Sequence, residues 1–66
     1  MSKLKITIGN ELGASEVITS KQNLRQVLDE RNAQIVEDLM RAMSNIPKCN
    51  SIEQRVNGID YYVDKI

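Results

Sequence analysis

The stretch SIEQRVNGIDYYVDKI, residues 51–66, limits the fold of this chain more than any other segment. Its Asn57-Gly58 pair is the preferred dipeptide of a two-residue type I′ turn, which connects two antiparallel strands. A hairpin built on this turn sets Val56 opposite Ile59. The same register gives the further pairs Gln54–Tyr61, Ile52–Val63, Arg55–Asp60 and Glu53–Tyr62. Apolar and opposite-charge residues both match across the two strands, so we predict a hairpin here.

The other end of the chain has the pattern of a second hairpin. In KLKITIG, residues 3–9, apolar residues alternate with polar ones, which is typical of a half-buried strand. The segment GNELGA, residues 9–14, contains turn-forming glycine and asparagine. The β-branched stretch SEVIT, residues 15–19, is therefore predicted to return antiparallel to the first strand.

Between the hairpins, residues 20–46 have the composition of a helix. Ser20 suits a helix N-cap, and Pro47 ends the helical region because the residue before a proline avoids the α conformation. We expect one continuous helix, because a single apolar stripe runs through it. The stripe consists of Leu24, Val27, Leu28, Ile35, Leu39, Ala42 and Ile46. Arg31 lies within the same stripe, and we expect its guanidinium to reach solvent.

A break near Asn32 is the alternative to one helix. After Asn32 the apolar stripe widens to include Val36, Met40 and Met43. A continuous helix from Lys21 to Asn45 would be roughly 37 Å long, whereas a six-residue strand spans only about 20 Å. The far half of one long helix would then overhang the sheet and expose these three side chains.

The order of elements predicts an α+β fold, ββαββ, over a single domain of residues 1–66. Four antiparallel strands would form one sheet, with the helix packed on one face. The first half resembles the ubiquitin-like β-grasp fold, which also opens with a hairpin and a helix, here NLRQVLDERN. The resemblance is topological and implies no function.

Composition limits both the core and the chemistry. The chain has no Phe, Trp or His and a single cysteine, Cys49. No internal disulfide or zinc site is available to stabilise a domain this small, so we expect oligomerisation. Cys49 has no histidine base, and the carboxylate pairs Asp29-Glu30 and Glu37-Asp38 diverge on a helix surface. We therefore expect no enzyme activity, no metal and no cofactor, and the free thiol suggests a cytoplasmic protein.

Two functions remain in view. The first is a small protein-binding module, a regulator, inhibitor or assembly factor, that binds another protein and forms a homodimer. Its predicted interface is the exposed helical face of Val36, Met40 and Met43. The alternative is nucleic-acid binding through a basic patch on the first hairpin and the start of the helix. The residues of that patch are Lys3, Lys5, Lys21 and Arg25. A net charge of zero disfavours nucleic acid and offers no attraction to membranes.

Overall fold

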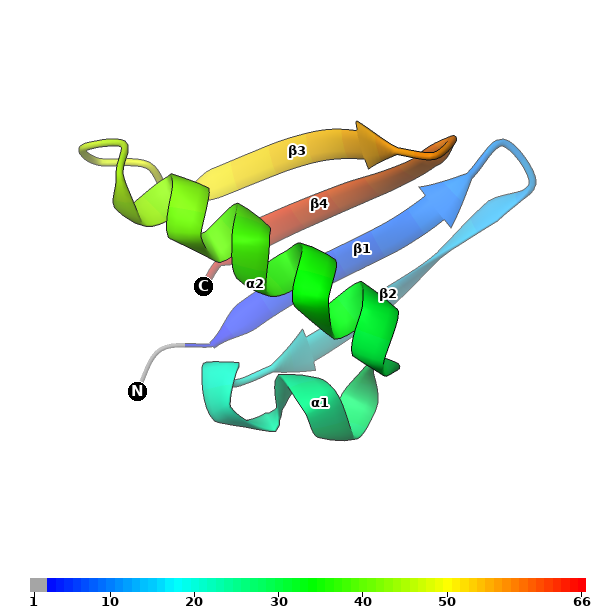
Figure 1. The fold of residues 1–66 in the computed structure, drawn as a ribbon, viewed down its shortest axis with the longest axis horizontal. Coiled ribbons are helices and arrows are strands. Elements are labelled where there is room, and N and C mark those ends of the chain that lie inside the picture. The colour runs from blue at the N-terminus through cyan, green and yellow to red at the C-terminus, as the bar shows by residue number, and fades with distance from the viewer. Residues whose placement is uncertain (1–2) are drawn as a thin grey trace.

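The computed structural model describes residues 3–66 and has the predicted α+β class and ββαββ order (Figure 1). Its four strands form one antiparallel sheet in the order β2-β1-β4-β3. The strands are β1 (Leu4–Asn10), β2 (Gly13–Thr19), β3 (Ser51–Val56) and β4 (Ile59–Lys65). The first and last strands of the chain therefore pair at the centre of the sheet, and β2 and β3 form its edges.

The second hairpin confirms the predicted register residue by residue. Val56 pairs with Ile59, and all four further pairs occur as expected. Asn57 and Gly58 have φ values of 53° and 80°, which are the positive values that a type I′ turn requires at both central positions.

The first hairpin has a shorter connection than the sequence suggested. Only Glu11 and Leu12 lie between the strands, and the backbone N–H of Leu12 donates to Oδ1 of Asn10 at 2.8 Å. Gly9 is a strand residue and pairs with Ala14. Its lack of a side chain is required there, because a Cβ at residue 9 would lie 2.4 Å from the Cβ of Ala14.

The expectation of one continuous helix is wrong. The helical region contains a short 3-10 turn η1 (Lys21–Asn23), then α1 (Leu24–Val27), then α2 (Glu30–Ser44). The chain is extended at Leu28, with φ −119° and ψ 151°, so the alternative of a broken helix is confirmed, with the break at Leu28 and Asp29, just before the predicted Asn32. The Asp29 carboxylate accepts a 2.7 Å hydrogen bond from the backbone N–H of Asn32 and caps α2. Ser20 stands before η1 but makes no side-chain cap.

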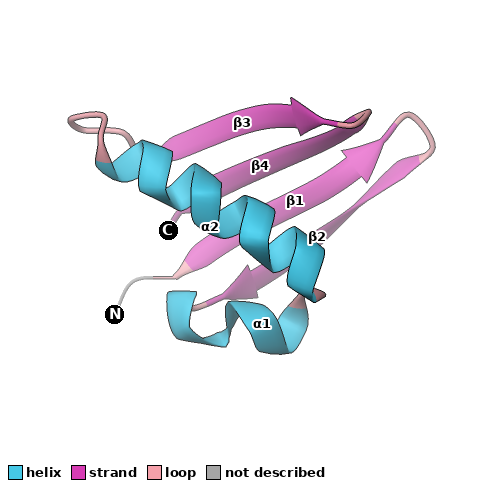
Figure 2. Ribbon diagram, viewed as in Figure 1, coloured by secondary structure: helices cyan, strands magenta, loops and turns pink. Residues whose placement is uncertain are grey.

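The break adjusts the helix to the length of the sheet. The fifteen residues of α2 span about 22 Å, which is close to the roughly 23 Å of a seven-residue strand. Both helices lie on the same side of the sheet, with α2 across β3 and β4 and α1 beside β2 (Figure 2). No helix in the described part of the chain is long and apolar enough to cross a bilayer.

The core lies between this face of the sheet and the helices. Its buried members are Leu4, Ile6, Leu24, Val36, Leu39, Met43, Tyr61 and Val63. Tyr61, with 1% of its surface exposed, is the largest of them. Its ring fills the space that Phe or Trp often occupies in a small core. Its hydroxyl donates to Oδ1 of Asn32 at 2.8 Å, so its polar tip also has a partner.

A candidate binding groove beside helix α2

The predicted interface on the far half of the helix is not an exposed face. Val36 is 0% exposed and Met43 1%, because the restarted helix turns both toward the sheet. Met40 is half-buried at the edge of the core. The expected homodimer rested on an overhanging apolar face, and the burial of Val36 and Met43 removes that reason for it.

The predicted basic patch is divided among different surfaces. Lys5 points away from the helices and lies 3.7 Å from the Glu16 carboxylate on the open face of the sheet. Arg25 lies on α1 and is paired with Glu37. Lys21 alone faces the hollow described next, while Lys3 is exposed ahead of β1.

A groove of about 470 Å³ lies between α2 and the end of the sheet where Leu4 pairs with Lys65. We call it the α2 groove. Its lining residues are Leu4, Lys21, Glu37, Met40, Arg41, Ser44 and Lys65. They come from β1, η1, α2 and β4, so the groove is formed only by the complete fold.

The helix geometry and the strand pairing explain how each wall is formed. Glu37, Met40, Arg41 and Ser44 stand at helical spacings of three and four, which places them on one face of α2. Leu4 opens β1 and forms part of the apolar floor. Lys65 is the register partner of Leu4 and therefore emerges on the same face of the sheet.

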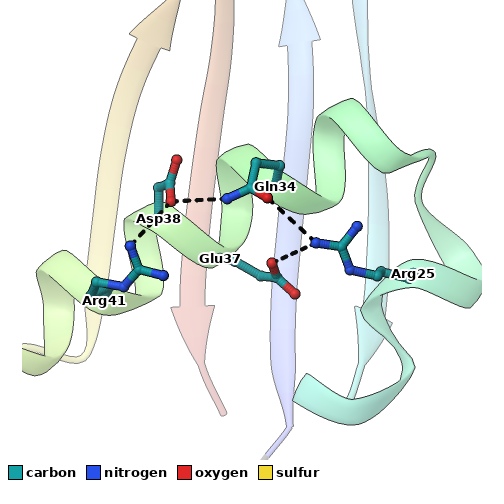
Figure 3. A network of polar contacts seen from close by, with 5 residues as sticks. All are labelled: Arg25, Gln34, Glu37, Asp38 and Arg41. Carbon is teal, nitrogen blue, oxygen red and sulfur yellow. Dashed lines mark hydrogen bonds and ion pairs between the residues drawn. The ribbon is translucent and has the colours of Figure 1, made fainter.

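A polar network on the surface connects α1 with α2 (Figure 3). Nη2 of Arg25 lies 2.8 Å from Oε1 of Glu37, joining the two helices across the break. The same nitrogen lies 3.5 Å from Gln34, whose amide donates to Asp38 at 3.2 Å. The Arg25–Glu37 pair offsets the negative charge of Glu37, the acidic residue that lines the groove.

The remaining charges of the α2 groove are basic. Arg41 has an exposed partner, Asp38, at 3.6 Å, and such exposed pairs contribute little. Within residues 3–66, the ion pairs do not include Lys21 or Lys65. The balanced total charge therefore conceals a local excess of positive charge.

The open face of the sheet has the opposite character. Strand alternation places two basic residues there, Lys5 and Arg55. It places four acidic residues on the same face: Glu16, Glu53, Asp60 and Asp64. The two sides of the molecule thus differ in charge, although the sequence as a whole is neutral.

The described residues offer few groups for catalysis or metal binding. Cys49 lies in the loop after α2, where its thiol donates to the Ser51 carbonyl oxygen at 3.1 Å. Residues 3–66 contain no cluster of three or more potential metal ligands. Arg31 is exposed on α2, in agreement with the expected solvated guanidinium.

Comparison with protein-family models, curated proteins and solved structures found no significant match to this chain.

Sequence reasoning found Lys21 and Met40 but missed Arg41 and Lys65. Lys65 joins the groove only because β4 pairs with β1, a contact between the two ends of the chain. The position of Arg41 beside Lys21 depends on the turn at Leu28 and Asp29. No local pattern signals either contact.

Proposed function

We propose that this protein is a non-enzymatic protein-binding module and that the α2 groove is its contact site. The observation that carries the proposal is the combination of an apolar floor with a charged rim. Leu4 and Met40 supply the floor, and polar side chains from separate elements surround it. An apolar centre with a polar border is the usual composition of a protein interface.

The groove is also held in shape before any partner arrives. The Arg25–Glu37 ion pair ties α1 to α2, and Asp29 caps the start of α2. A preformed site loses less conformational entropy on binding than a flexible one. This supports a binding role for a surface that the fold keeps in place.

A non-enzymatic role is supported by the chemistry of the lining. The groove offers carboxylate, guanidinium, ammonium and hydroxyl groups but neither thiol nor imidazole. Glu37, the one carboxylate, is engaged by Arg25 and is poorly suited to act as a general base. The unpaired Cys49 supports a reducing compartment, and we propose the cytoplasm.

A steric block of the groove tests the proposal. Ser44 lies at the end of α2 and lines the groove, so Ser44→Trp should fill it without changing any charge. Arg31→Trp is the control, because Arg31 is exposed on the same helix but outside the lining. Tagged wild-type and control proteins should retain a common partner from native lysate, and Ser44→Trp should lose it.

The partner is then identified by mass spectrometry and its binding repeated with purified proteins. Circular dichroism and thermal unfolding would establish that both tryptophan variants are folded. A partner retained equally by wild type, control and Ser44→Trp would move the contact site away from the groove.

A further inference from the structure

We infer that the α2 groove binds an acidic peptide segment, one with carboxylates on either side of an apolar side chain. This inference rests on the proposed function and names the chemistry of the partner. The feature behind it is the juxtaposition of Lys21, Arg41 and Lys65 around the apolar floor of Leu4 and Met40.

Charge gives the first part of the argument. The three basic side chains come from η1, α2 and β4, and they converge on one hollow. The acidic lining residue, Glu37, is already neutralised by Arg25 at 2.8 Å. Carboxylates entering the groove would therefore meet basic groups that lack strong partners of their own.

The floor gives the second part. Leu4 is only 4% exposed, so it presents a small apolar surface at the bottom of the groove. Met40 is half-buried beside it, and the flexible thioether side chain adapts to ligands of different shape. An apolar side chain at the centre of the bound segment would cover both residues.

Peptide is favoured over nucleic acid by what surrounds the groove. Single-stranded nucleic acids are usually bound by a basic track with aromatic rings for base stacking. Tyr61 is buried in the core and Tyr62 lies on the opposite face of the sheet, so no ring lines the groove. That opposite face is acidic and would repel a phosphate backbone extending beyond the groove.

Fluorescence anisotropy with a short labelled peptide tests the inference. The probe carries aspartate and glutamate on both sides of a central leucine, and its control has asparagine and glutamine in their place. The acidic probe should bind and the neutral control should not. Added salt should weaken the binding, because exposed charges are screened.

Lysine variants locate the binding in the groove. Lys21→Gln and Lys65→Gln should each raise the Kd of the acidic probe roughly two- to fivefold, as expected for partly exposed ion pairs. The double variant should weaken binding by about tenfold. Lys48→Gln is the matched control, since Lys48 is exposed in the loop after α2 and outside the groove. Its Kd should change by less than about twofold.

Three results would overturn the inference. The first is equal binding of the acidic and neutral probes, and the second is equal binding by the groove variants and the wild type. The third is tighter binding of a single-stranded oligonucleotide of matched charge with the same lysine dependence. If the acidic probe fails while Ser44→Trp still abolishes binding of an identified protein, the acidic chemistry is wrong and the proposed function stands.

Discussion

The hydroxyl of Tyr61 donates a 2.8 Å hydrogen bond to the Asn32 side chain, joining the centre of the sheet to the first turn of α2. The ring is 1% exposed, so its hydroxyl has no ready access to bulk water as a substitute. The backbone N–H of the same Asn32 is bound by Asp29. One asparagine thus connects the helix cap to the core.

Tyr61→Phe should destabilise the fold by about 1–2 kcal/mol, because it removes the donor and leaves the Asn32 oxygen without this partner. Urea denaturation followed by circular dichroism would measure the loss. Tyr62→Phe is the control, since Tyr62 is 37% exposed on the open face of the sheet. Equal stability of the two variants would contradict the structural role of the bond.

Asp29→Ala should cost about 1 kcal/mol of unfolding free energy, since it leaves the N–H of Asn32 without its cap. Asp29→Ser should retain most of the stability, because serine can accept the same bond. Thermal unfolding of the two variants would compare them directly. An alanine variant as stable as the serine variant would mean that α2 starts without help from residue 29.

Gly9→Ala should destabilise the first hairpin by roughly 1–3 kcal/mol, in the range of overpacked sites. The new Cβ would lie 2.4 Å from Ala14 Cβ and 2.7 Å from the Gly13 carbonyl oxygen. Adding Ala14→Gly removes the first clash but not the second, so the double variant should recover part of the loss. Chemical denaturation would measure the stability of both variants. A Gly9→Ala variant as stable as the wild type would disprove the close approach of residues 9 and 14.

Lys48→Gly should stabilise the protein by about 0.5–1 kcal/mol, since glycine adopts positive φ without the steric cost that other residues incur. Lys48 has φ 60° and follows Pro47 in a turn closed by the bond from Cys49 N–H to the Ile46 carbonyl oxygen. Lys48→Ala keeps the steric cost while removing the charge, so it should give no gain. A shift in melting temperature for glycine alone would establish the backbone origin of the effect.

The protein should sediment as a monomer of 7.5 kDa at low micromolar concentration. The apolar face that suggested a dimer is turned into the core, with Val36 and Met43 both buried. Analytical ultracentrifugation would decide the matter. If a dimer formed instead and the Met40→Asp substitution dissociated it, the dimer interface would lie at the edge of α2.

The strands could be predicted from the sequence because their signals are local. Asn57-Gly58 defines a turn by itself, and the alternating residues on both sides then fix the register. The class, the order of elements and the single sheet follow from the two hairpins and the helical region between them.

The helix was mispredicted because its phase was counted without interruption from Leu24. An extended residue at Leu28 resets the rotation, so residues that seemed to form a second apolar face belong to one stripe. That stripe consists of Ala33, Val36, Leu39 and Met43. Asp29, with a favoured capping side chain, was the available signal for the restart. The groove depends on this reset and on the pairing of distant strands, which no local pattern reveals.

The pairing of β1 with β4 has a consequence for how the chain is made. β1 is synthesised first of the four strands, but its central partner, β4, is synthesised last of the four. Until β4 is made, β1 has only β2 beside it, and the core lacks Tyr61 and Val63. The native fold therefore forms only once β4 has been made, and a chain cut short before β4 would be readily degraded by proteases.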